Sequence, residues 1–174
     1  MSLILPFGDR SPSIPDSAWV APNATLIGGV TLGERASVFY GAVLRADVDS
    51  ITIGDDTNLQ DNVTMHCDAG TPASVGARVS VGHGAILHGC TVEDDCLIGM
   101  GSTVLNGAVV GAGSLVAAGA VVLEGTVIPP RSLVAGVPGK VRRELTDDEI
   151  AGIRSNADHY LTISAAHAAI DLLP

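Results

Sequence analysis

Aliphatic residues recur at every sixth position along most of this chain, and glycine often follows one of them. An α-helix would repeat its apolar positions near every 3.6 residues and a simple strand near every 2. A period of six predicts hexapeptide repeats, in which three short strands form one triangular coil of roughly 18 residues. We therefore expect an all-β solenoid, a left-handed parallel β-helix, over residues 1–140 with a short N-terminal lead-in. Its longest inward-facing column reads Ile86, Val92, Ile98, Val104, Val110, Val116, Val122, Ile128 and Val134.

Two interruptions break the six-residue spacing. The step from Leu44 to Ile53 is nine residues, and the segment 66–72 has the composition of a loop. A slip of one residue also separates Leu87 from the long column. Insertions into a solenoid commonly lie on its functional face. Between the loop and the long column, six-residue spacing is kept at Val75, Val81 and Leu87.

A helix is predicted after the repeats. Thr146 with Glu149 three residues later has the pattern of a capping box, and acidic residues fill the first turn. We expect this helix to run to about Leu172, and residues 141–174 to pack along the solenoid within one structural domain. Its apolar stripe comprises Ile150, Ile153, Ala157, Tyr160, Leu161 and Ser164.

The composition agrees with a narrow solenoid and excludes several functions. Hydrophobic residues make up 47% of the 174 residues but aromatic residues only 3%, so small aliphatic side chains must fill the core. With 9 Lys+Arg against 19 Asp+Glu, the chain offers no basic surface for nucleic acid or an anionic membrane. No stretch approaches the roughly 20 consecutive apolar residues of a membrane span, and residues 1–6 do not have the pattern of a signal peptide. Three cysteines without framework spacing favour a reduced, cytoplasmic setting.

Two histidines are expected to stack on one face of the solenoid. His66 and His88 are separated by 22 residues, 66 to 88, which is one coil plus a few residues of the loop between them. If the loop absorbs the excess, their side chains lie about 5 Å apart on adjacent strands. Arg45 precedes His66 by 21 residues and joins the same ladder. That spacing suits two ligands of one metal ion.

His83 lies only five residues before His88, nearly one side of the triangle away, and Gln60 and Asp61 should share its face. A neighbouring subunit that presents its His83 to this subunit's His66 and His88 would unite all three. A three-sided prism that repeats this contact closes as a homotrimer with three sites. Three imidazoles with an open fourth position are typical of catalytic zinc, and iron or cobalt also suit them.

Plainer interpretations of these side chains stay open. The three histidines could be hydrogen-bonded residues at a polar edge. His159 and His167, on the predicted helix, are expected to be solvated surface residues. Cys67 and Cys90 could act as soft metal ligands, although burial as small hydrophobic residues is the simpler expectation.

Five segments of the chain resemble γ-class carbonic anhydrases and their relatives. The histidine motif is specific, whereas hexapeptides alone are shared with many acyltransferases. The resemblance extends from about Pro12 to Glu149, and it implies a left-handed β-helix with a C-terminal helix, a trimer, and a metal ion at the subunit interface. The segments are Trp19–Ala24, Tyr40–Asp47, Asn58–Asn62, Gly82–Cys90 and Ile98–Gly101.

The resemblance also implies roles for particular residues. It places His66 and His88 on one subunit and His83 on the next. The family's arginine and aspartate fall on Arg45 and Asp47, which would form interface ion pairs. Further matches are Gln60, which would orient the metal-bound hydroxide, the adjoining Asp61, and Tyr160 as a helix tyrosine near the site.

This chain departs from the family pattern near the site. The family's arginine–glycine–aspartate is Arg45-Ala46-Asp47 here, and Val48 stands where the best-studied form has a glutamate. That form also has an acidic loop after the first histidine, where this chain has Asp68 as the single acid. Proton export would then depend on buffer or on one of His159, Asp68 and Tyr160.

The leading functional hypothesis is reversible hydration of CO₂ to bicarbonate by a metal-bound hydroxide. Hydrolysis of an ester or thioester by the same hydroxide is a second hypothesis. CoA-dependent acyl transfer is a third, because the segment 135–139 resembles one that acyltransferases place near CoA, and it predicts no bound metal. A non-catalytic scaffold is the fourth.

Overall fold

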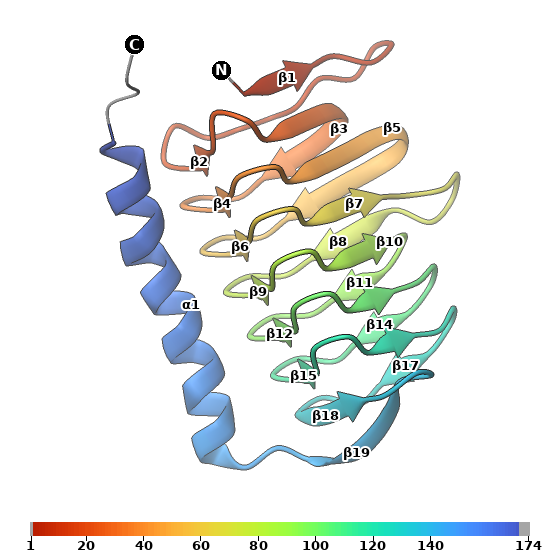
Figure 1. The fold of residues 1–174 in the computed structure, drawn as a ribbon. Helices are drawn as coiled ribbons and strands as arrows, with labels where there is room; N and C mark the ends of the chain where they lie inside the picture. Colours follow the sequence, from red (N-terminus) through yellow and green to blue (C-terminus); the bar gives the residue numbers. More distant parts are fainter. Residues whose placement is uncertain (1, 171–174) are drawn as a thin grey trace.

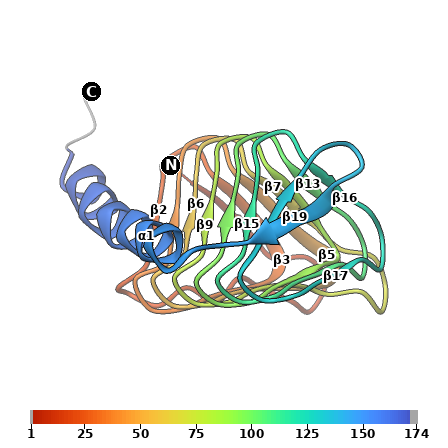
Figure 2. The same ribbon diagram turned by 90° about the horizontal axis from the view of Figure 1, so that it is seen from below.

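The chain forms a parallel β-solenoid with a helix along its side (Figure 1). This computed structural model describes residues 2–170. Successive coils stack their strands in parallel, and the C-terminal helix α1 (Asp147–Ala168) runs back along the stack. Figure 2, viewed along the solenoid, shows the coils enclosing one core with the helix outside it. The β-helix expected from the six-residue spacing is confirmed.

The strands build three faces. The first face stacks β2 (Trp19–Val20), β4 (Ser37–Val38), β6 (Asn58–Leu59), β9 (Ser80–Val81), β12 (Leu97–Ile98), β15 (Leu115–Val116) and β18 (Ser132–Ala135). The second continues from the first halves of β3 (Thr25–Leu32) and β5 (Val43–Ile53) through β7 (Thr64–His66), β10 (Ile86–His88), β13 (Thr103–Val104) and β16 (Val121–Val122). The third continues from their second halves through β8 (Ala73–Val75), β11 (Thr91–Val92), β14 (Val109–Val110) and β17 (Val127–Ile128). At the two ends, β1 (Leu3–Leu5) pairs with β3 and the antiparallel β19 (Lys140–Glu144) pairs with β18.

The predicted inward-facing column fills the core from Val92 onward, where every member is at most 2% exposed. The prediction that Ile86 begins this column is wrong, because Ile86 is 42% exposed and its neighbour Leu87 is fully buried. Leu87 pairs with Met65 in the preceding coil and with Val104 in the next. The slip of one residue therefore lies at the corner after Leu87, where Gly89 has a φ of 54°.

The nine-residue step from Leu44 to Ile53 forms one long strand, β5. This strand passes from the second face to the third, and its halves pair with β7 and β8. The adjacent β3 follows it closely, and its register shifts after Gly28. A Cβ at Gly28 would lie 2.3 Å from the Ala46 carbonyl oxygen, and the φ of Gly28 is 74°, so this crossing requires glycine.

Helix α1 covers the first face. Its capping box is present as predicted, with Glu149 N donating to Thr146 Oγ1 and Thr146 N donating to the Glu149 carboxylate. The predicted stripe contacts the solenoid, although Tyr160 and Leu161 are only partly buried. The helix ends at Ala168, and the expected end near Leu172 lies outside the described residues. Within residues 2–170 no helix is long and apolar enough to cross a membrane.

Candidate metal centre

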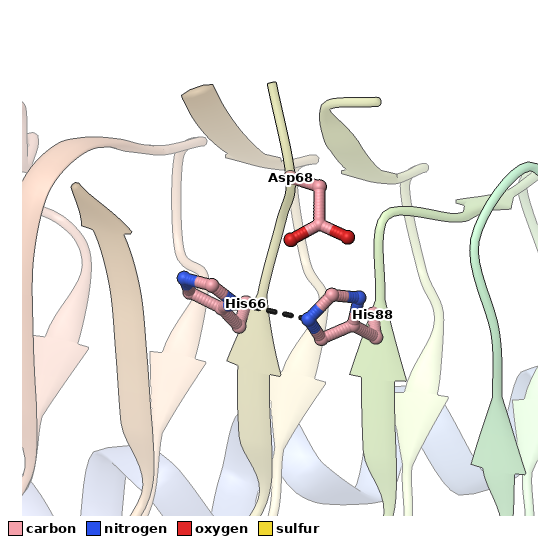
Figure 3. Close-up of side chains that lie close together, drawn as sticks. All are labelled: His66, Asp68 and His88. Carbon is pink, nitrogen blue, oxygen red and sulfur yellow. Dashed lines mark hydrogen bonds between the residues drawn. The ribbon is translucent and has the colours of Figure 1, made fainter. Parts of the chain in front are cut away.

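Arg45, His66 and His88 occupy matching positions on three consecutive strands of the second face. Arg45 pairs with His66 between β5 and β7, and His66 pairs with His88 between β7 and β10. The two imidazole centroids are 5.0 Å apart, and His66 Nδ1 lies 2.9 Å from His88 Nε2 (Figure 3). The loop after His66 absorbs the additional residues, so the ladder predicted from the spacing is confirmed.

The outer nitrogen of each ring faces a hydrogen-bond acceptor. His66 Nε2 lies 3.0 Å from Asp47 Oδ1, and His88 Nδ1 lies 2.6 Å from Asn106 Oδ1. Asn106 turns this oxygen toward His88 because its Nδ2 donates to Asp68 Oδ2 at 2.8 Å. A neutral imidazole carries one N–H, and the outer acceptors, Asp47 Oδ1 and Asn106 Oδ1, favour the tautomer that places this N–H on the outer nitrogen of each ring. In these tautomers the two inner nitrogens, 2.9 Å apart, are both acceptors, and a shared proton or a cation between them would satisfy both.

A carboxylate approaches the same point from the loop after His66. The ligand atoms of His66, Asp68 and His88 all lie within 4.8 Å of one another, and Figure 3 shows the Asp68 carboxylate beside the two rings. Imidazole and carboxylate groups are the usual ligands of catalytic zinc. Tetrahedral zinc with Zn–N bonds of about 2.0–2.1 Å holds two nitrogens about 3.3 Å apart. The rings would fit such an ion after separating by a few tenths of an ångström.

Asp47 connects the ladder to Arg45. Its second carboxylate oxygen accepts a hydrogen bond from Arg45 Nη1, while the first faces His66. Burial by itself would raise the pKa of Asp47, but the hydrogen bonds from Arg45 and His66 outweigh it and lower the pKa below its usual value. Asp47 therefore stays an anion that can orient His66. In this chain the Arg45–Asp47 ion pair is an intramolecular contact.

His83 lies apart from these residues, at the corner between the first and second faces. Its Nδ1 is 2.9 Å from Asp61 Oδ2, and its side chain is 45% exposed. The backbone also joins the two coils here, because Gly84 N donates to the Asp61 carbonyl oxygen. His83 precedes strand β10, and His88 is the last residue of that strand. The separation expected from the five-residue spacing, and the position of Asp61 one coil below His83, are both confirmed.

Gln60 and Tyr160 meet His83 at a cavity of about 330 Å³ between α1 and the first face. Gln60 is buried and its Nε2 donates to Asn58 Oδ1 at 3.2 Å. Tyr160 reaches the cavity from the helix and packs edge-to-face on Phe39, with the ring centroids 5.6 Å apart. Burial, followed by the negative charge of Asp61, raises the pKa of Tyr160, so its phenol stays protonated at neutral pH. The structure thus places Gln60 and Tyr160 beside His83 and away from the His66–His88 pair.

Two residues of this region were missed or misjudged at the level of sequence. Asn106 was not predicted to belong to the site. It follows His88 by 18 residues, one full coil, so the spacing that stacks His88 on His66 also stacks Asn106 on His88. His167 was expected on the solvated surface, as was His159, which is indeed exposed. His167 Nδ1 instead lies 2.9 Å from the Tyr40 hydroxyl, and its ring lies against Trp19 with centroids 5.7 Å apart. The helix carries His167 back to the first coils, which local spacing could not reveal.

Cys67 and Cys90 are core residues. They are 0% and 1% exposed and pack with the aliphatic column. Burial raises the pKa of the Cys90 thiol to about 12, and burial raises that of Cys67 as well. Both thiols are therefore protonated at neutral pH and make poor ligands, since the thiolate is the form that binds metal.

Comparison with known proteins shows that the chain is similar to hexapeptide-repeat proteins. Residues 89–124 match the family of bacterial transferase hexapeptides (six repeats). The crystal structure of a hexapeptide transferase family protein from Anaplasma phagocytophilum is similar with a TM-score of 0.91 and 39% identity, covering 94% of this chain and 97% of that one.

More specific relatives are carbonic anhydrases. "Probable carbonic anhydrase" of Methanocaldococcus jannaschii is 59% identical over 83% of this chain and 91% of its own length. "Gamma carbonic anhydrase 1, mitochondrial" of Arabidopsis thaliana is 44% identical over 95% of this chain and 62% of its own, longer sequence. This chain belongs to the γ-class carbonic anhydrase family.

Proposed function

We propose that this protein is a metal-dependent γ-class carbonic anhydrase, which interconverts CO₂ and bicarbonate. The observation that carries the proposal is the His66–His88 pair. Its inner nitrogens, His66 Nδ1 and His88 Nε2, lie 2.9 Å apart, and both outer nitrogens have hydrogen-bond partners. Zinc is the expected ion, with iron or cobalt as alternatives. As is established for carbonic anhydrases, a bound zinc ion lowers the pKa of its water to about 7 and so supplies hydroxide at neutral pH.

The chain's own residues prepare three imidazoles for this task. Each ring has one partner that receives its N–H and leaves the other nitrogen available as a ligand. Such partners fix ring orientation and typically change metal affinity 10–100-fold. Gln60, buried at the cavity beside His83, is proposed to orient the hydroxide through its side-chain amide. The proposed partners are Asp47 for His66, Asn106 for His88 and Asp61 for His83.

We assign the third ligand position to His83 of a neighbouring copy in a homotrimer. The second face begins after His83 and carries the ladder at the ends of its strands. It supports this assignment because it presents an outward stripe of aliphatic and threonine side chains. Ile86, at its centre, is 42% exposed in the single chain. A neighbouring copy packed on this stripe would bring its own His83 close to His66 and His88 of the first copy. The stripe comprises Val43, Thr64, Ile86, Thr103 and Val121, which pair in register.

Asp68 offers a competing third ligand within one chain. Its side chain is exposed and already accepts a hydrogen bond from Asn106, whereas His83 is held by Asp61 with its other nitrogen available. The two arrangements differ in one respect. An intersubunit site needs His83, and a site within one chain needs Asp68.

Subunit mixing separates the two arrangements. Trimers of His83→Ala or of His66→Ala alone should each hold almost no zinc and show no CO₂ hydration above background. Trimers co-assembled from both variants should recover one complete site each, because one subunit supplies His83 and its neighbour supplies the pair. Full zinc content in His83→Ala, with loss in Asp68→Asn, would instead assign the site to a single chain.

The trimer and the reaction have their own tests. Ile86→Arg should dissociate the trimer in light scattering, because it places a charge in the middle of the apolar stripe, whereas Val127→Arg on the third face should not. Stopped-flow assays of the zinc-loaded wild type should show CO₂ hydration that disappears in His88→Ala. Zinc-loaded trimer without CO₂ hydration would refute the proposed reaction while leaving the metal site intact.

A further inference from the structure

The cavity between α1 and the first face is larger than CO₂ hydration requires. Its volume of about 330 Å³ is more than twice that of the roughly 150 Å³ apolar cavity that holds benzene in another protein. It can therefore accommodate a molecule of roughly ten non-hydrogen atoms. Of its lining residues, Gln60 and His83 belong to the proposed reaction site.

The walls of the cavity are mostly apolar. Leu97 and Leu115 come from the first face and are partly covered by the helix, and Ala117 and Met100 extend the same surface. His83 is the one lining residue with an ionisable basic group, and no lysine or arginine lines the cavity among the described residues. An anionic ligand would have no fixed positive charge to meet, so the lining favours an uncharged molecule with an apolar part.

The helix side of the cavity carries an unsatisfied polar group. Asn156 lines the cavity, and its Oδ1 is buried without a hydrogen-bond partner among the described residues. Buried side-chain oxygens are nearly always paired in native proteins. Tyr160 lies four residues later, so both side chains project from the same face of α1. An asparagine amide offers one acceptor and two donors in a plane.

We propose that this cavity binds a small uncharged carboxamide, with the amide of Asn156 paired to the ligand's amide and the ligand's alkyl chain against Leu97 and Leu115. The ligand N–H donates to Asn156 Oδ1, and the ligand carbonyl accepts from Asn156 Nδ2. This site goes beyond CO₂ hydration and needs no metal ion. The two assignments can therefore fail independently.

Hexanamide is the probe for this site, and hexanoate is its matched control with the same shape but a negative charge. Titrations of the full-length, metal-free protein would be followed by ¹H–¹⁵N NMR, including the side-chain amide of Asn156. Hexanamide should shift the signals of residues 97, 115 and 156 and should bind at least about tenfold more tightly than hexanoate. Equal binding of the two probes, or hexanamide shifts that avoid these residues, would overturn the proposal.

Three variants complete the test. Asn156→Leu keeps the volume of the side chain and should weaken hexanamide about tenfold while leaving the weak hexanoate binding unchanged. Ala117→Leu should fill the cavity and abolish binding of both probes. Ala151→Leu, on the exposed side of the same helix, is the control for added bulk and should bind hexanamide like the wild type. Wild-type affinity in Ala117→Leu would show that the probe binds elsewhere.

Discussion

Replacing Asn106 with alanine tests whether this residue holds His88 in the orientation that metal binding needs. Asn106 accepts from His88 Nδ1 at 2.6 Å and donates to Asp68 at 2.8 Å, so alanine removes both contacts. His88 then has no fixed tautomer, and part of its ring population presents an N–H to the ion. Loss of such a partner typically weakens metal binding 10–100-fold, which corresponds to about 1.4–2.7 kcal/mol. The metal-free protein should lose no more than about 1.5 kcal/mol of unfolding free energy.

The assay is competition for zinc between the protein and a chromophoric chelator at pH 7.5, with urea unfolding of the metal-free protein measured in parallel. Asn106→Asp is the matched control, because it keeps an acceptor for His88 while removing the donor to Asp68. Zinc affinity should stay at or above the wild-type value in this variant. Wild-type affinity in Asn106→Ala would refute the orienting role. An equal loss in both variants would show that the contact to Asp68, and not the one to His88, carries the effect.

Three further predictions concern the solenoid itself. Leu87→Ala should lower the unfolding free energy by about 2–5 kcal/mol in urea titrations, because it empties a fully buried core position, and a loss below about 1 kcal/mol would contradict its inward orientation. The hydrogen bond from Arg78 lowers the pKa of Asp95, so Arg78→Gln should cost up to about 1 kcal/mol at pH 7. That difference from wild type should shrink as the pH falls below the unfolded-state pKa of about 3.9, and a difference that does not change with pH would exclude the ionised pair as its cause. Because burial raises the pKa of Cys90 to about 12, this thiol should be inert to a disulfide reagent at pH 8 until denaturant is added, and rapid native labelling would contradict its burial.

Much of the fold was predictable because hexapeptide repeats are local. Each coil repeats one short pattern and contacts mainly the coils before and after it, so residues one coil apart must lie side by side. Counting residues per coil in this way correctly predicted that His66 stacks on Arg45 and His88 on His66. It also predicted that His83 lies at another corner of the coil. The helix start at Thr146 was equally local, since a capping box involves only neighbouring residues.

The tertiary structure decided the features that depend on how the irregular segments fold. Ile86 and Leu87 are both aliphatic, and only the pairing of Leu87 with Met65 and Val104 determines which of them enters the core. Asp68 lies in a loop that does not follow the six-residue spacing. Its position beside the two imidazoles follows from the hydrogen bond that it accepts from Asn106.

The six-residue spacing also could not predict the contacts between the C-terminal helix and distant parts of the chain. Helix α1 leaves the repeat, and its direction along the first face brings His167 to Tyr40, 127 residues earlier, and Asn156 to the cavity above Leu97. Periodicity relates a residue to its neighbours within the stack of coils. It carries no information on how a separate helix packs against that stack, because side-chain packing over the whole face sets this position.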